Sequence, residues 1–140
     1  MQTFLPLPDF QESAQCLDFQ RLGKQRVETL QILNTLTGRS EGWKNHPATK
    51  MWRGYTFALA EYGSVICREW IKRGYQDTCL GKILDIQFSV CSSNLRLPEW
   101  FGDPEFHLSH QSNLIRKLPE HYRQFWPDVP SDLPYIWPKA

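Results

Sequence analysis

Residues 12–36 read ESAQCLDFQRLGKQRVETLQILNTL, and most of the predicted architecture follows from this stretch. Its apolar residues recur at helical spacing, at Leu22, Val27, Leu30, Leu33 and Leu36. This periodicity predicts one long amphipathic helix, which Gly38 ends because glycine is favoured just after a helix. Gly23 destabilises a helix interior, so we expect another helix, the N-terminal segment or a DNA backbone to approach closely there.

The polar face of this helix lies within RLGKQRVE, residues 21–28. Cationic side chains can hold phosphates, an amide can contact a base edge or a phosphate, and a carboxylate can move protons. The alternative is a solvated face with i,i+4 ion pairs, each contributing only about 0.3–0.5 kcal/mol, and composition by itself slightly favours it. The candidate DNA-contacting or catalytic residues of this face are Arg21, Lys24, Gln25, Arg26 and Glu28.

A second long helix is predicted downstream. Pro47 suits the first turn of a helix capped by Asn45 or His46, and apolar residues keep a helical period from there to Gly74. The following residues, 78–101, fit either a short helix or an irregular packed segment.

The remaining segments complete the predicted fold. Asp103 opens a third helix, which Pro119 interrupts. The start of the chain is marked by prolines and extended, and the tail is an aromatic, proline-rich strap that we expect to lie over the helices. We therefore expect an all-α protein, a compact single domain over residues 1–140 with about three main helices.

Composition supports a globular protein. A length of 140 residues suits one domain, and a hydrophobic content of 41% supplies one core. No apolar run is long enough to cross a bilayer, and the start, MQTFLPLPDF, lacks the features of a signal peptide. We expect a cytoplasmic protein without membrane contact.

The charge is small overall but unevenly distributed. A formal net charge of +1 argues against a protein that binds polyanions indiscriminately. Residues 21–53 hold seven basic and two acidic side chains, whereas acidic residues gather in the last third of the chain. One basic face with a more acidic rim favours oriented docking on phosphates.

Metal and cofactor chemistry is not indicated. The four cysteines, Cys16, Cys67, Cys79 and Cys91, include no CxxC pair, so we expect buried free thiols. The motifs of P-loop, dinucleotide-binding and serine-hydrolase sites are missing from the sequence. We expect no metal and no cofactor.

Two further segments combine rings or histidines with cations. In WKNHPATKMWRG, residues 43–54, rings and cations interleave as in nucleic-acid sites, although His46 equally suits a helix cap. In FHLSHQSNLIRK, residues 106–117, polar side chains share a helical face, and hydrogen-bonded histidines are favoured over a metal site. The candidate DNA contacts are Trp43, His46, Arg53, His110, Gln111 and Lys117.

The order of these segments resembles the small all-α pyrimidine-dimer DNA glycosylases with abasic-site lyase activity, called endonuclease V in phages. The resemblance rests on an extended start leading into QRLGKQRV (20–27), on SVICREWIKRGY (64–75) and on SHQSNLIRKLPEHY (109–122). It runs nearly end to end, and the MQTFLP start indicates a bacterial or phage branch of the family.

The resemblance implies a mechanism. In the family, the α-amine at the mature N-terminus attacks the sugar C1′, the base leaves, and a Schiff base forms before β-elimination cuts the strand. An α-amine keeps a larger neutral fraction near pH 7 than a lysine side chain does, which suits this nucleophile. A carboxylate assists, Arg21, Arg26 and Lys117 are implied to hold the kinked backbone, and the partner base is flipped out.

The catalytic carboxylate departs from the family pattern. Family members have a glutamate directly after the first helix arginine, whereas Leu22 follows Arg21 here. Glu28, two turns later, is the expected replacement, and Asp18, one turn earlier, is the alternative.

The nucleophile departs as well. Family members expose a small residue after removal of the initiator methionine, whereas Gln2 is large enough that Met1 is expected to stay. The Met1 amine is therefore the expected nucleophile, and the side-chain amine of Lys24 is its rival.

The expected function is a DNA glycosylase and abasic-site lyase that acts, as a monomer in a bacterial or phage-infected cell, on damaged or modified pyrimidines in duplex DNA. Two alternatives stay open. One is a DNA-binding module of the same fold without chemistry, and the other is an enzyme that acts on a modified base or nucleotide.

Overall fold

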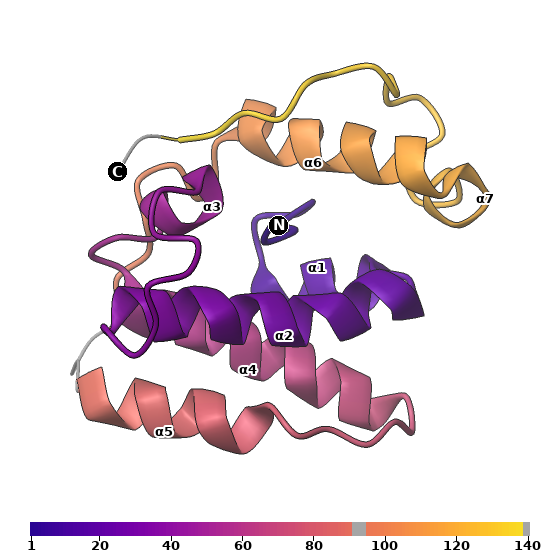
Figure 1. The fold of residues 1–140 in the computed structure, drawn as a ribbon. Coiled ribbons are helices and arrows are strands. Elements are labelled where there is room, and N and C mark those ends of the chain that lie inside the picture. Colours follow the sequence, from indigo (N-terminus) through magenta and orange to yellow (C-terminus); the bar gives the residue numbers. More distant parts are fainter. Residues whose placement is uncertain (91–94, 139–140) are drawn as a thin grey trace.

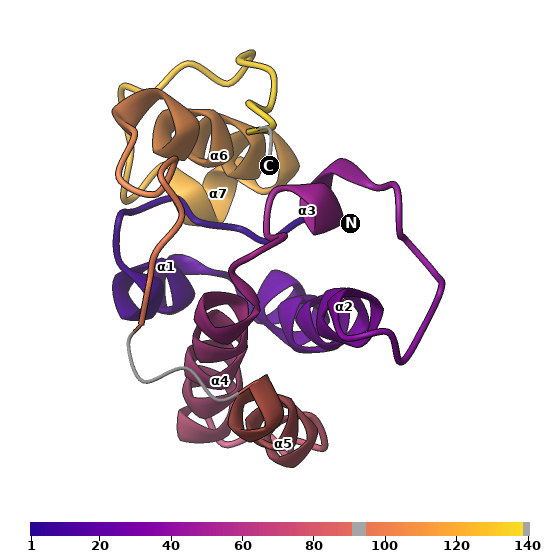
Figure 2. The same cartoon turned by 90° about the vertical axis from the view of Figure 1, so that its left-hand side faces the viewer.

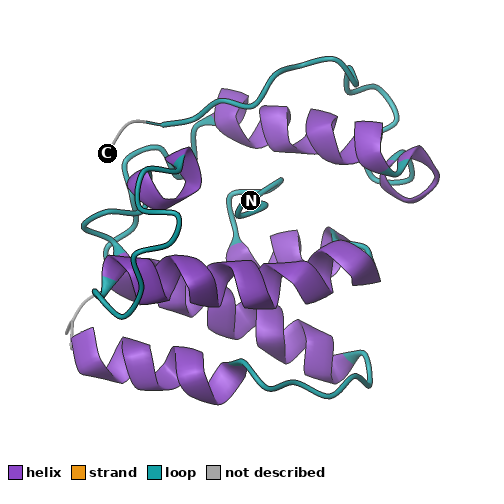
Figure 3. Ribbon diagram, in the orientation of Figure 1, coloured by secondary structure: helices purple, strands orange, loops and turns teal. Residues whose placement is uncertain are grey.

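The computed structural model describes residues 1–90 and 95–138, which form helices joined by turns and extended segments (Figure 1). The helices are α1 (Phe10–Cys16), α2 (Phe19–Leu36), α3 (Pro47–Lys50), α4 (Thr56–Lys72), α5 (Leu80–Val90), α6 (Pro104–Lys117) and α7 (Pro119–Tyr122). The described residues contain no strand, which confirms the all-α prediction (Figure 3). None of these helices has the length and apolar character needed to cross a membrane.

The helices form two layers with the start of the chain between them. In the lower layer of Figure 1, α4 packs against α1, α2 and α5. The upper layer contains α6, α7 and the C-terminal extended segment. Figure 2 shows the N-terminal segment, residues 1–8, passing between α6 above and α2 below. The segment therefore fills the space between the layers.

The predicted helix over residues 12–36 is in fact two helices, α1 and α2. Leu17 and Asp18 take extended backbone conformations, and the Asp18 side chain caps α2 by accepting a hydrogen bond from the Arg21 N–H. The hydroxyl of Tyr122, far along the chain, accepts the Asp18 N–H at 3.0 Å. This tertiary contact stabilises a break that the leucine periodicity conceals.

The buried face of α2 also differs from the prediction. Leu22 and Leu33 are buried as expected, but Val27 is 45% exposed and Gln25 is 1% exposed. A Cβ on Gly23 would lie 3.0 Å from the Trp70 ring of α4, so a neighbouring helix explains this glycine. The buried face is therefore rotated toward Gln25.

The predicted second helix is likewise interrupted. His46 caps α3 as predicted, since its Nδ1 accepts the Ala48 N–H at 3.0 Å and Pro47 occupies the first turn. The chain then turns through Gly54, at a φ of +85°, before α4 begins. Gly74, at a φ of +96°, follows the end of α4 as predicted.

The last part of the chain follows the sequence prediction more closely. Residues 80–90, which the sequence left open, form α5. Asp103 caps α6 by accepting the Glu105 N–H at 3.1 Å. The tail lies along α6, where the Ser112 hydroxyl accepts the Leu133 N–H at 3.0 Å. The predicted strap over the helices is thus confirmed.

The cysteines fit the prediction where they are described. Cys16, Cys67 and Cys79 are buried free thiols. Cys91 lies outside the described residues. Within the described residues, cysteine therefore behaves as a small core residue.

Gln25 of α2 holds the N-terminal segment as a neighbouring strand would. Its amide oxygen accepts the Phe4 N–H at 2.9 Å, and its amide nitrogen donates to the Gln2 carbonyl at 2.8 Å. The Tyr62 hydroxyl of α4 lies 2.6 Å from the same amide oxygen and 2.8 Å from the Phe4 carbonyl oxygen. All these groups are buried, so their hydrogen bonds replace those that water would make.

The upper layer binds the backbone of Leu5, the next residue of the N-terminal segment. His110 Nδ1 of α6 accepts the Leu5 N–H at 2.9 Å, and His107 Nδ1 donates to the Leu5 carbonyl at 2.7 Å. The His107 tautomer follows from its other nitrogen, which accepts the Gly102 N–H at 2.9 Å. The predicted hydrogen-bonded histidines are confirmed, and they join the two layers through the N-terminal segment.

Gly63 allows α4 to lie close to its neighbours, and we predict that Gly63→Ala lowers the free energy of unfolding. A Cβ there would lie 2.8 Å from Thr29 Cγ2 and 3.1 Å from Ile83 Cδ1. Overpacking of about 1–3 kcal/mol should outweigh the gain of about 1 kcal/mol in helix propensity. Urea unfolding measures the change. Gly81→Ala, with no atom within 4 Å of the new Cβ, is the control and should not destabilise; equal effects would contradict this packing.

We predict that stability falls as the pH drops below about 6.5, the usual pKa of histidine. Burial, together with a smaller effect of the nearby His107, lowers the pKa of His110 to about 3. Between these two pH values the unfolded chain binds a proton that the folded chain excludes, which costs up to about 1.4 kcal/mol per pH unit. Urea unfolding from pH 7 to 4 measures the slope. His110→Asn retains an acceptor for Leu5 and should flatten the slope; an unchanged slope would refute this assignment.

Candidate active site

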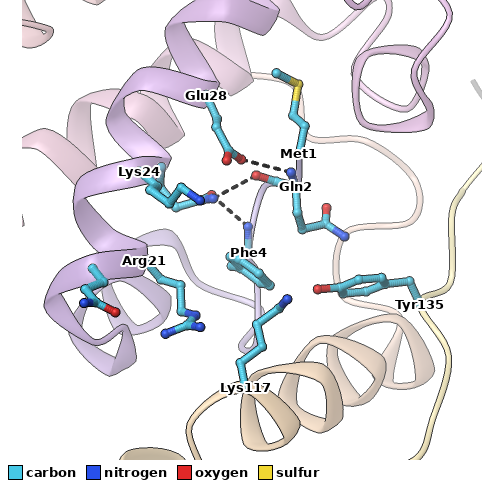
Figure 4. A pocket seen from close by; sticks show the side chains of 10 residues that line it. Met1, Gln2, Phe4, Arg21, Lys24, Glu28, Lys117 and Tyr135 are labelled. Atoms are coloured by element: carbon cyan, nitrogen blue, oxygen red, sulfur yellow. Dashed lines mark hydrogen bonds between the residues drawn. The ribbon is translucent and has the colours of Figure 1, made fainter.

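A cleft of about 560 Å³ lies between α2 and the end of α6, next to the N-terminus (Figure 4). Three segments that are distant in sequence form its walls: the N-terminal segment, the first half of α2, and the α6 end with the C-terminal strap. Its lining residues are Met1, Gln2, Phe4, Gln20, Arg21, Lys24, Gln25, Glu28, Lys117 and Tyr135. All three predicted catalytic residues, Met1, Arg21 and Glu28, are thus brought together.

Glu28 binds the first peptide group of the chain. Its Oε2 accepts the backbone N–H of Gln2 at 3.0 Å. Glu28 lies one turn after Gln25 on α2, so the two side chains reach successive parts of the extended N-terminal segment. The carboxylate therefore lies beside the peptide that follows the residue carrying the α-amine. The described residues contain no ion pair between that amine and a carboxylate.

The charges of the Met1 amine and of Glu28 both act on the pKa of His46. Burial lowers the pKa of His46, the positive charge of the Met1 amine lowers it further, and Glu28 acts in the opposite direction. The His46 ring itself packs edge-on between Trp43 and Trp137, at centroid distances of 5.7 and 5.8 Å. His46 is therefore a neighbour of the cleft, although it does not line it.

Three cationic side chains line the same cleft as the carboxylate. Arg21, Lys24 and Lys117 all line the cleft, and Figure 4 shows their side chains around the N-terminal segment. Arg21 pairs with Asp18 at 3.2 Å and remains 23% exposed. Lys24 and Lys117 are exposed and form no ion pair with another described residue. The entrance is therefore positive, as an anion-binding site requires.

Asp18, the alternative carboxylate, is not available in the cleft. It is 6% exposed, caps α2, pairs with Arg21 and accepts a hydrogen bond from the Tyr122 hydroxyl. Burial and this hydrogen bond raise the pKa of Tyr122, so the hydroxyl keeps its proton. Asp18 thus positions Arg21, and Glu28 is the carboxylate that lines the cleft.

Three residues predicted to contact DNA need correction. Gln25 lines the cleft, but both the oxygen and the nitrogen of its amide are hydrogen-bonded to the N-terminal segment. Arg26 points elsewhere, since it pairs with Asp77 at 2.6 Å and lies 4.4 Å above the Trp70 ring. His110 is fully buried and binds Leu5. All three side chains make contacts within the protein. The polar pattern of a helical face does not show whether such a side chain binds another part of the protein or faces solvent.

The remaining predicted contacts lie outside the cleft lining. Trp43 and Arg53 are exposed on the segments flanking α3, and they remain predictions as DNA contacts together with His46. Gln111 is partly buried and donates to the Pro6 carbonyl at 2.8 Å, which makes it another anchor of the N-terminal segment.

Sequence reasoning missed several cleft residues, above all Gln2 and Tyr135. The size of Gln2 predicts that Met1 stays, but no sequence pattern marks the amide of Gln2 as part of a site. Tyr135 belongs to the strap, whose contacts depend on how the tail crosses α6. Sequence periodicity contains no information on that crossing.

The arrangement suits nucleophilic attack next to a polyanion. It combines an amine, a carboxylate and three cations in one concave site, which is the pattern of a covalent catalyst with an anionic substrate. In the part of the chain that the structure describes, no group of three or more His, Cys, Asp or Glu side chains is placed to hold a metal ion.

Comparison with known proteins identifies one family. A family model described as pyrimidine dimer DNA glycosylase matches residues 1–82. The matched region contains the N-terminal and α2 walls of the cleft, whereas Lys117 and Tyr135 lie beyond it. No curated protein and no solved structure matches the chain. Because the family model covers more than half of the 140 residues, the chain belongs to the pyrimidine dimer DNA glycosylase family of DNA repair.

Proposed function

We propose that the protein is a DNA glycosylase and abasic-site lyase that acts on damaged pyrimidines in duplex DNA through its N-terminal amine. One observation supports this function above the others. Glu28 accepts the Gln2 N–H at 3.0 Å inside a cleft that Arg21, Lys24 and Lys117 make positive. An N-terminus held beside a carboxylate and among cations meets the needs of imine chemistry on DNA.

The first part of the proposed reaction releases the base. The neutral Met1 amine attacks C1′ of the deoxyribose, and the bond between C1′ and the base breaks. The base leaves C1′ with the electron pair and takes up a proton from water. The Glu28 carboxylate accepts the proton that the attacking nitrogen loses, which its position beside the first peptide allows.

The second part cuts the strand. Glu28 returns its proton to the ring oxygen of the sugar as the ring opens, and the nitrogen and C1′ then form a protonated imine. The Glu28 carboxylate, free again, takes a proton from C2′, and the bond between C3′ and the phosphate oxygen breaks, so that the 3′ phosphate leaves by β-elimination. The cations of the cleft bind the phosphates on either side of the reacting sugar, as Arg and Lys do in DNA complexes.

We predict that borohydride traps a covalent adduct between the wild-type protein and a duplex containing an abasic site. Glu28→Gln retains the size of the side chain but cannot accept a proton, so the trapping rate should fall by on the order of 10²-fold. Lys24→Arg retains the positive charge without a nucleophilic amine, and it should trap within a few fold of wild type. Gel electrophoresis of the reduced adduct measures the rates.

The outcomes separate the candidate functions. An absence of adduct on both abasic-site and thymine-dimer duplexes would contradict the lyase function and favour a DNA-binding module without chemistry. Loss of the adduct in Lys24→Arg, with Glu28→Gln unaffected, would move the nucleophile to Lys24.

We also predict that Lys117→Gln weakens DNA binding uniformly across sequences. Loss of one phosphate contact should reduce the slope of log K against log salt by about 1. Lys72→Gln, in the last turn of α4 outside the cleft, removes the same charge and serves as the control. Fluorescence anisotropy over a salt series measures the slopes, and equal slopes for the two variants would argue against a phosphate contact in the cleft.

A further inference from the structure

Gln2 has one polar group without a partner, at the wall of the cleft. The residue is 4% exposed, its N–H donates to Glu28, and its carbonyl accepts from Gln25. Its side-chain oxygen accepts the Thr3 N–H at 2.8 Å, which fixes the amide orientation because a backbone N–H can only donate. The remaining atom, the buried nitrogen Nε2, makes no hydrogen bond to any residue that the structure describes.

A buried donor without a partner is rare in folded proteins and requires an explanation. Relief by a simple rotation is not available, because turning the amide over would place its NH2 group against the Thr3 N–H. The donor is thus held by the same network that holds the N-terminal segment. An acceptor on a bound substrate that reaches Nε2 would give this donor its missing partner.

Tyr135 supplies a second donor in the same part of the cleft. Its hydroxyl makes no hydrogen bond to another described residue, and it lines the cleft together with Gln2. Burial raises the pKa of Tyr135 to about 12, so the hydroxyl keeps its proton near neutral pH. Figure 4 shows the Gln2 side chain on the Tyr135 side of the N-terminal segment, with Glu28 and Lys24 on the other side.

The two sides of the segment therefore offer different chemistry. The Glu28 side has a carboxylate for proton transfer, and the Gln2 side has neutral donors. A pyrimidine carries a carbonyl oxygen, O2, next to the nitrogen that bonds to the sugar. Negative charge develops on that oxygen when the glycosidic bond breaks, and hydrogen-bond donors placed there stabilise the departure of the base.

We propose that Gln2 Nε2, together with the Tyr135 hydroxyl, donates hydrogen bonds to the O2 carbonyl oxygen of the leaving pyrimidine. This inference rests on the proposed function and adds to it the groups that recognise the base. Nε2 is covered in the free protein, so the base must displace part of the cleft wall. We expect the Tyr135 side chain to move, because it lies on an extended segment and not on a helix.

Gln2→Glu tests the proposal with little change in shape. The carboxylate keeps an acceptor for the Thr3 N–H and replaces the free donor by an oxygen. Glutamate is also too large for Met1 to be removed, so the N-terminus stays the same. Single-turnover assays should compare cleavage of the glycosidic bond in a thymine-dimer duplex with strand cleavage at a preformed abasic site, which has no base to stabilise.

The expected result is a selective loss. Glycosidic-bond cleavage by Gln2→Glu should slow by on the order of 10²-fold, the usual effect of removing one such donor. This loss should exceed any loss at the abasic site at least tenfold. Tyr135→Phe should show the same selectivity with a smaller loss. Gln15→Glu, which adds the same charge at an exposed position of α1, should lose neither activity.

Gln2→Met provides a second test if a carboxylate at this position prevents folding. It removes the donor without adding charge, and its thermal unfolding by circular dichroism shows whether it folds. Equal losses on both duplexes in the folded variants would overturn the role of Gln2 and leave the proposed function standing. A wild-type protein that acts on neither duplex would overturn both.

Discussion

The hydrogen bonds between Gln25 and the backbone of residues 2–4 determine how this molecule is assembled. No described residue forms a strand beside the N-terminal segment, and a side-chain amide from α2 pairs with it instead. His107 and His110 hold the next residue from the other layer. If this segment were released, buried polar groups in both layers would lose their partners, at a cost of about 1–3 kcal/mol each. The hydrogen bonds that join the two layers therefore also fix the position of the N-terminus.

The same segment divides the cleft into functional parts. Glu28 contacts the first peptide from one side, and the unpartnered nitrogen of Gln2 lies on the other. The positive charge comes from two separate layers, with Arg21 and Lys24 on α2 and Lys117 at the end of α6. The family match covers the N-terminal and α2 walls, whereas the α6 and strap wall lies beyond it.

Helix positions could largely be predicted from sequence because caps and glycines act locally. The cap at Asp103 and the end before Gly74 are examples. Breaks in helices were missed where distant residues stabilise them, as Tyr122 does at Asp18. In the site, the grouping of Met1, Arg21 and Glu28 was predicted from the family resemblance and one helical face. Burial of a polar residue such as Gln25 depends on a segment more than twenty residues away, which periodicity cannot show.

Identification of the atom that joins the DNA would test whether the anchored N-terminus is the reacting group. The borohydride-reduced adduct with an abasic-site duplex can be digested and sequenced by tandem mass spectrometry. Because Glu28 holds the first peptide in the cleft, we predict that the sugar fragment is attached to the α-nitrogen of Met1. Attachment to Lys24 or Lys117, both of which line the same cleft, would contradict this account.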